Sequence, residues 1–317
     1  MITNVHLPLL VSLLLAGSSP VLATRLSPAR AGTALVAAAA AAAAASTTWV
    51  LLLLTVAFAP TTHLLSGRMA GGGRLVHPVP AAVAVAVVIG LAAATLRVAN
   101  VLRRRHRITR QLRALCQTCG VGREELIVAP IAQPHAFAVP GRFGHGDSSG
   151  GRILVTVGML RALDAPGRRA LLAHERAHLT GRHHRHRAVM EIAAALNPLL
   201  IPARAAVTYL VERAADEHAA TTIGDRRVAA DALATAALAA AAPAGGTHPA
   251  VSPDTALAYS RFGLARRVAA LHAAPLPERH LLLVLLIALA THTAAQTIHT
   301  VAAFSSAELA HIPIPGL

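Results

Sequence analysis

The stretch Leu171-Leu172-Ala173-His174-Glu175-Arg176-Ala177-His178 places two histidines and a glutamate directly after three apolar residues. Positions four apart lie on one face of an α-helix, so His174 and His178 can point toward the same spot. Imidazole nitrogens are common zinc ligands, whereas buried imidazoles without a partner are costly. The stretch therefore predicts a buried helix, beginning near Arg168, that binds a metal ion.

Glu175 lies between the two histidines, beside the predicted metal but not required to bind it. A carboxylate there can take a proton from a zinc-bound water, whose pKa falls toward about 7, and pass it to a departing amine. We therefore expect Glu175 to be a general base. The alternative is a solvated helix that holds no metal, and the apolar run before His174 argues against it.

A catalytic zinc site needs a third protein ligand, and His184 is one candidate. It follows His178 by six residues, with Gly181 midway, a spacing in which a glycine turn returns a third histidine to the metal. Enzymes with this spacing also have a methionine turn downstream, and no methionine follows Met190.

Glu212 is the other candidate, thirty-four residues after His178. On a second helix its carboxylate can bind the metal, while Asp216, one turn later, holds the distal ring nitrogen of a ligand histidine. We favour Glu212 and keep His184 as the alternative.

The composition excludes an ordinary soluble protein. Of 317 residues, 55% are hydrophobic and 14% charged, and the mean hydropathy is +0.55. A chain this apolar buries or inserts its side chains, so disorder is excluded too. The net charge of +15 comes from arginine alone, and we attribute it to codon bias, with no direct nucleic-acid partner expected. Cys116 and Cys119 have redox-motif spacing without a βαβ pattern, so we interpret them as ordinary reduced thiols.

Four apolar stretches are long enough to cross a bilayer, which takes about 20 mostly uncharged residues per helix. They cover residues 5–23, 33–60, 80–102 and 281–304. No Lys or Arg precedes the first, so we interpret it as a retained anchor and not a signal peptide. The second contains nine consecutive alanines, which are only weakly hydrophobic, so its half at 49–54 must drive insertion.

Arginine placement predicts the orientation. Arg103, Arg104, Arg105 and Arg107 directly follow the third span, and positive residues near span ends tend to stay in the cytoplasm. We expect a multi-pass protein of the cytoplasmic membrane, with the link at 63–79 outside. It divides into a membrane region (1–102), a cytoplasmic domain (103–280), a fourth span (281–304) and a short external tail (305–317).

The domain at 103–280 combines a small sheet with helices. Short β-like runs occur at 126–129, 136–139 and 153–156, and helical spacing of leucines begins after Gly158. Residues 242–249 predict a loop, and residues 255–274 predict another helix. The fold class is mostly α, with four transmembrane helices and a cytoplasmic α+β domain that contains a small sheet.

Three runs of sequence resemble membrane-embedded gluzincin peptidases, namely residues 158–163, 169–179 and 212–216. The most similar group is the β-lactam sensor-transducer (BlaR/MecR-type) metallopeptidases, and HtpX-like and prenyl-protein proteases are more distant. The sensor group also has four spans, with its peptidase domain between the third and fourth. Sensor proteins carry an extracellular penicillin-binding domain after the last span, whereas this sequence ends at Leu317, so we do not expect acylation by a β-lactam.

The resemblance implies a zincin-like domain with one Zn²⁺ per chain. It implies that His174, His178 and Glu212 bind zinc, that Glu175 is the general base and that Asp216 supports a ligand histidine. The expected function is a membrane zinc metalloendopeptidase that cleaves a cytoplasmic or membrane-proximal protein. Analogy suggests a transcriptional repressor in a signalling pathway, or misfolded membrane protein, as the substrate. The alternative function is a non-catalytic membrane signal transducer with a structural metal site.

An extended substrate is expected to add as a strand along residues 136–139, and this brings one carbonyl to the metal. Tyr209, Arg204 and His218 are equal candidates for stabilising the charge that develops on its oxygen.

Two further sets of polar residues are interpreted without a role in metal binding. The cationic run at 182–187 predicts a solvated or lipid-facing helix surface. His292, Gln296 and His299 share one side of the last span, where polar groups usually face the bundle interior.

Overall fold

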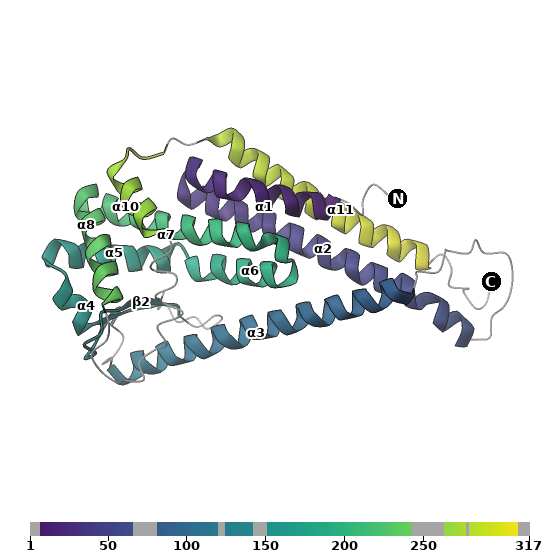
Figure 1. The fold of residues 1–317 in the computed structure, drawn as a ribbon, viewed down its shortest axis with the longest axis horizontal. Helices are drawn as coiled ribbons and strands as arrows, with labels where there is room; N and C mark the ends of the chain where they lie inside the picture. The colour runs from purple at the N-terminus through teal and green to yellow at the C-terminus, as the bar shows by residue number, and fades with distance from the viewer. Residues whose placement is uncertain are drawn as a thin grey trace.

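The fold is a set of long helices joined to a small mixed domain (Figure 1). The structure, a computed structural model, describes residues 7–65, 81–119, 124–141, 151–242, 263–276 and 279–309. The predicted loop at 242–249 and link at 63–79 lie almost entirely outside these ranges, as does the tail after residue 309.

Four helices in the described ranges are long and apolar enough to cross a membrane. They are α1 (Leu7–Arg25), α2 (Pro28–Leu65), α3 (Ala81–Cys119) and α11 (His280–Leu309). Each covers all or nearly all of one of the four stretches predicted from the sequence. Helices α1, α2 and α11 pack against one another, whereas α3 diverges from them and has only 6% of its apolar window buried (Figure 1).

The alanine run of α2 is a packing surface. Ala38, Ala39 and Ala42 are completely buried, in a cluster that also contains residues of α1 and α11. Alanine's short side chain lets neighbouring helices approach closely, so the run serves contact between helices more than contact with lipid. Leu51 and Leu53, in the half expected to drive insertion, remain exposed.

Helix α3 continues without a break from its apolar part through the arginine run to Cys119. Its 39 residues make a rod of roughly 58 Å at 1.5 Å per residue. Leu112, Leu115 and Cys116, near its end, pack in the same cluster as Ile127 and Leu154 of the sheet. The helix therefore joins the apolar region to the sheet directly.

The sheet has three strands, at the positions that the sequence predicts. They are β1 (Leu126–Ala129), β2 (Ala136–Val139) and β3 (Arg152–Thr156). Their order is β1-β3-β2, with β1 parallel and β2 antiparallel to β3. Among the described residues, β2 is thus an edge strand.

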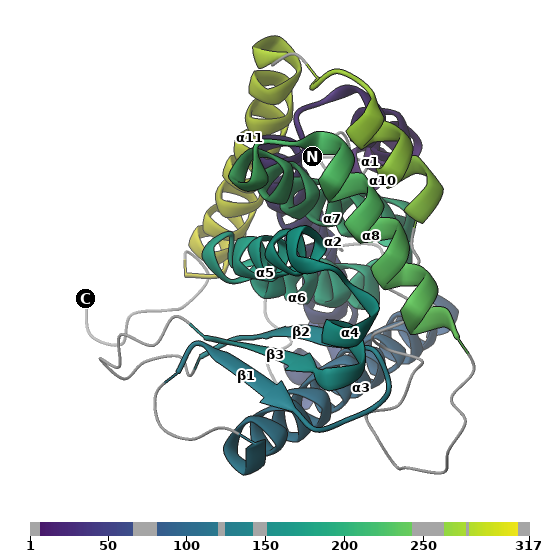
Figure 2. The same cartoon turned by 90° about the vertical axis from the view of Figure 1, so that its left-hand side faces the viewer.

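The chain continues after the sheet with helices that form a second layer. They are α4 (Val157–Ala162), α5 (Ala165–Thr180), α6 (His183–Leu196), the short 3₁₀ helix η2 (Pro198–Leu200), α7 (Ile201–Ile223), α8 (Arg226–Ala241) and α10 (Leu264–His272). Helix α5 begins where Asp164 caps it, its Oδ1 accepting a hydrogen bond of 2.8 Å from the Gly167 amide. Figure 2 shows α5 between the sheet and α7, and it contacts β2, β3 and α7.

The sequence predicts that the polar residues of the last span face the bundle interior, and this prediction is wrong for the two histidines. His292 and His299 are exposed, and Gln296 is half-buried. Thr293 is the buried polar residue here, and its hydroxyl donates to the Leu289 carbonyl of its own helix. A threonine can satisfy its hydroxyl in this way within one turn, so it fits the helix contact that a larger imidazole does not.

Gly158 is required by a close approach between backbone segments. A Cβ at this position would lie 1.9 Å from the Ala132 carbonyl oxygen, on the segment that leads into β2. We expect Gly158→Ala to lower the free energy of unfolding by about 1–3 kcal/mol, the usual range for overpacking, since backbone must move to admit the methyl group. Thermal unfolding of nanodisc-embedded protein, followed by circular dichroism, measures the change.

Gly17→Ala is the matched control, because a Cβ at Gly17 meets no atom within 4 Å. An unfolding midpoint for Gly158→Ala as high as that of the control would contradict the expected clash.

Candidate metal centre

Helix α5 brings His174, Glu175 and His178 to its buried side, facing α7 and β2. The two histidines lie one turn apart, and their Nε2 atoms are 3.1 Å from each other. Burial and the positive charges of His174 and Arg187 hold the pKa of His178 well below its usual range. Its imidazole is therefore neutral, the form that binds metal ions.

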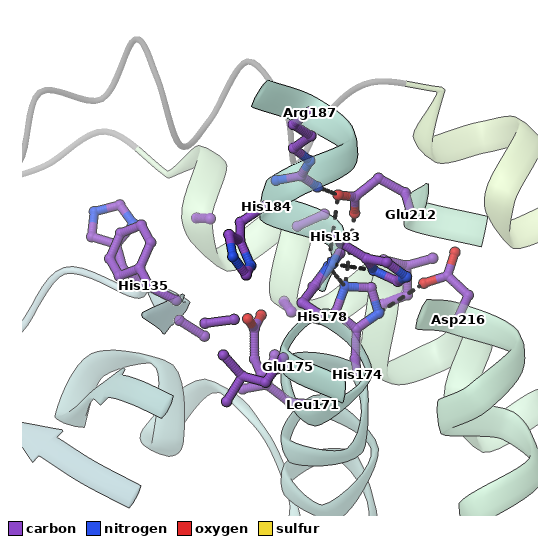
Figure 3. Close-up of a pocket in the computed structure, with 18 of the residues that line it drawn as sticks. His135, Leu171, His174, Glu175, His178, His183, His184, Arg187, Glu212 and Asp216 are labelled. Atoms are coloured by element: carbon purple, nitrogen blue, oxygen red, sulfur yellow. Dashed lines mark hydrogen bonds and ion pairs between the residues drawn. The ribbon is translucent and has the colours of Figure 1, made fainter. Parts of the chain in front are cut away.

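Helix α7 contributes Glu212, which is 5% exposed. Its Oε2 lies 3.7 Å from His174 Nε2, and its Oε1 lies 3.7 Å from His178 Nε2. A tetrahedral zinc ion with bonds of about 2.0–2.1 Å separates its ligand atoms by roughly 3.3 Å. The two nitrogens and the carboxylate are thus close to the spacing that one ion requires, and this group can hold a metal (Figure 3).

His184 does not belong to this group. Helix α5 ends at Thr180, and Arg182 follows with a left-handed backbone (φ 49°), so the chain makes a tight turn before α6. His183, the first residue of α6, is buried, and its Nδ1 lies 2.8 Å from the Nδ1 of His178. The ring of His184 lines the neighbouring cavity instead (Figure 3).

The outer nitrogen of His174 faces Asp216, with 3.1 Å between His174 Nδ1 and Asp216 Oδ1. Arg267 of α10 donates to both oxygens of Asp216, from Nε at 2.8 Å and from Nη2 at 2.7 Å. Burial alone would raise the pKa of Asp216, but the charge and hydrogen bonds of Arg267 lower it to about 2. Asp216 is therefore an anion, and it raises the pKa of His174 despite the opposing effect of burial.

Two arginines contact Glu212, and the sequence analysis missed both. Arg187 of α6 is paired with Oε1, and Arg267 Nη1 lies 3.0 Å from Oε2. Arg187 and His183 belong to the run interpreted as a solvated surface, and that interpretation is wrong for them. Their spacing of four residues places both on one face of α6, a signal that could have found them. Arg267 lies far along the chain, and no local pattern marks it.

Glu175 points away from the facing nitrogens toward the sheet (Figure 3). Its carboxylate accepts a hydrogen bond from the backbone amide of Ala138 in β2. Burial raises the pKa of Glu175, and the positive charge of His174 only partly offsets this. A carboxylate with a raised pKa is a better proton acceptor near neutral pH.

A cavity of about 400 Å³ adjoins these residues. Helices α3, α5, α6, α7 and α8 and strand β2 all contribute to its wall. Of the three candidates for stabilising charge, only Arg204 lines it; Tyr209 is buried against Gly263, and His218 is exposed elsewhere on α7. Cys116 and Cys119 are free thiols on α3 and do not line the cavity.

Comparison with known proteins gives one match. Residues 102–209, about a third of the chain, match the family model for Peptidase family M48. The matched range contains His174, Glu175 and His178 and ends three residues before Glu212. No curated protein and no solved structure gave a match. Together with the apolar helices, the family match supports a metallopeptidase associated with a membrane, in a family whose members are typically zinc-dependent.

The two candidates for the third ligand predict different metal contents for single variants. We expect wild-type protein to retain about one zinc per chain, and His174→Ala and Glu212→Ala to lose most of it, because each removes one of three facing ligand atoms. His184→Ala is the control and should retain zinc. Inductively coupled plasma mass spectrometry of protein purified in lipid measures the ratio; loss of zinc in the His184 variant alone would reverse the assignment.

Removing the partner of a ligand histidine should weaken metal binding without abolishing it. We expect Asp216→Asn to reduce zinc affinity about 10- to 100-fold, because the anion that orients His174 and strengthens its basicity is lost. Competition with a fluorescent chelator gives the affinity. Asp231→Asn, at an exposed position on α8, should bind zinc as the wild type does.

Proposed function

We propose that this protein is an integral membrane zinc endopeptidase of the gluzincin type, nearest to the β-lactam sensor-transducer peptidases. The observation that carries the proposal is the convergence of His174, His178 and Glu212 beside a Glu175 that faces an edge strand. In this proposal the first three residues bind one Zn²⁺, Glu175 is the general base and Asp216 holds His174. The family match over the helix with both histidines supports it.

A zinc ion bound there would polarise the scissile carbonyl and lower the pKa of an attacking water. Glu175 accepts the proton of that water and delivers it to the leaving amine. Its raised pKa suits both steps, since a weakly basic carboxylate would hold the proton too loosely to be useful near neutral pH. Arg187 and Arg267 pair with Glu212, and they limit the negative charge that this buried carboxylate brings to the site.

The substrate backbone is proposed to lie along β2. Edge strands have unpaired backbone groups, and an extended peptide can pair with them. Strand β2 pairs with β3 on one side, and its residues Ala136 to Ala138 line the cavity next to Glu175. A peptide added here passes the general base, with Arg204 as the cavity-lining candidate for stabilising the carbonyl oxygen.

The proposed location is the cytoplasmic membrane, with the site on the cytoplasmic side. The arginine run of α3 supports this orientation, because positive residues at the end of a span tend to stay in the cytoplasm. The run continues the helix directly from its apolar part toward the site. We retain the division into 1–102, 103–280, 281–304 and 305–317. A protein or membrane-proximal peptide is the proposed substrate class, and a transcriptional repressor remains a candidate by analogy alone.

Replacing the general base should separate catalysis from metal binding. We expect Glu175→Gln to reduce cleavage of a fluorogenic casein substrate by at least about 100-fold in nanodiscs, because proton transfer is lost, while zinc content is unchanged. Glu125→Gln, at an exposed position paired with Arg176, is the control and should retain activity.

Equal cleavage by the Glu175 variant and the wild type would eliminate the enzymatic assignment. Bound zinc without cleavage in any of the three proteins would favour the alternative, a signal transducer with a structural metal.

A further inference from the structure

The helical hairpin α6–η2–α7, which belongs to the domain expected in the cytoplasm, has an unusually apolar turn. Between Ala188 and Val211 only two residues are charged, Glu191 and Arg204. The turn itself, residues 196–203, has Asn197 as its sole side-chain hydrogen-bonding residue. A loop between helices on a water-exposed domain is normally polar, so this composition indicates another environment.

The hairpin packs among the helices proposed to cross the membrane. Leu200, Val207 and Leu210 are completely buried in a cluster shared with residues of α1, α2 and α11. Helix α7 contacts α1 and α2, and α6 contacts α2. Figure 1 shows the hairpin lying along α1 and α2 rather than beyond their ends.

Asn197 locates the turn along those helices. Its Nδ2 donates to Ser12 Oγ of α1 at 2.8 Å and to Ser46 Oγ of α2 at 3.1 Å. Ser12 lies thirteen residues before the end of α1 at Arg25, so the turn reaches roughly 20 Å along α1 from that end. Both serines lie inside the apolar windows of their helices.

Lipid is expected to surround the bundle of helices into which the hairpin packs. Leu283 and Leu286 of α11 pack in the shared cluster, while Leu281 and Leu285, on the outer face of the same turns, are 71% and 56% exposed. Ile201, at the turn of the hairpin, is 47% exposed. Leucine faces of this kind on a membrane helix face acyl chains, and the hairpin belongs to the same packed cluster as this helix.

Several polar groups near the turn of the hairpin are satisfied from within the protein, as an apolar surrounding requires. Arg97 of α3 donates from Nε to the Ala195 carbonyl, at the end of α6 where helical carbonyls lack partners, at 3.0 Å. Glu191 is paired with Arg105 at 2.9 Å. The other charged residue, Arg204, lines the cavity.

We infer that α6–η2–α7 is a re-entrant hairpin whose turn, residues 196–203, inserts into the bilayer and contacts lipid. It enters and leaves on one side, because His183 at the start of α6 lies 2.8 Å from His178, and Glu212 and Asp216 in the second half of α7 face His174. The metal-competent group would then lie close to the membrane surface, held by helices anchored within it. This inference rests on packing and composition and does not depend on catalysis.

Site-directed spin labelling of full-length protein in nanodiscs tests the inference. Single cysteines are introduced as Ile201→Cys at the turn, Leu285→Cys on α11 and Asp231→Cys on α8, in a Cys116→Ala, Cys119→Ala background. Collision rates of the spin label with oxygen, which concentrates in lipid, and with a water-soluble nickel chelate report its surroundings.

The label at residue 201 should resemble the one at residue 285, with oxygen collisions exceeding nickel collisions, and the label at residue 231 should show the opposite ratio. A label at residue 201 that matches residue 231 would overturn the inference and place the turn in water. Pro198→Cys, also exposed at the turn, is measured in its place if the Ile201 variant does not fold.

Discussion

Two buried carboxylates impose the constraint on which the rest of the domain depends. Glu212 and Asp216 lie one turn apart on α7, and each is at most 5% exposed. An unpaired charge in such a place costs several kcal/mol, so each must meet cationic or hydrogen-bonding partners. His174 from α5 and Arg267 from α10 approach both carboxylates. Three helices that are distant in sequence are thereby brought to one point.

Helix α7 connects this point to the apolar helices. Leu210 is completely buried in the cluster that contains residues of α1, α2 and α11, while Glu212, two residues later, faces α5. A helix that is buried on nearly every side is central to a protein rather than peripheral. The candidate site and the helix bundle therefore share one continuous helix, with no linker between them.

Local periodicity accounts for much of what could be predicted. The strands at 126–129 and 136–139 and the four apolar helices follow from patterns within single segments, and the structure has them at those positions. The interpretation failed where side-chain direction depended on a neighbour. The run at 182–187 has the charge of a solvated surface, but the turn at Arg182 rotates part of it inward. The last span faces its partners with Thr293 and not with its histidines.

The order of residues alone is enough to place His174 and His178 on one helix face with Glu175 beside them, because the α-helical repeat is a property of a short segment. It also determined the division between apolar and polar regions, since transfer from water depends on composition. Helix packing brings Glu212, rather than His184, to the two imidazoles, and it places Arg187, Arg267 and His183 around this group. Those contacts join residues that are separated by a turn or by several helices, and their geometry is set by packing that no single segment encodes.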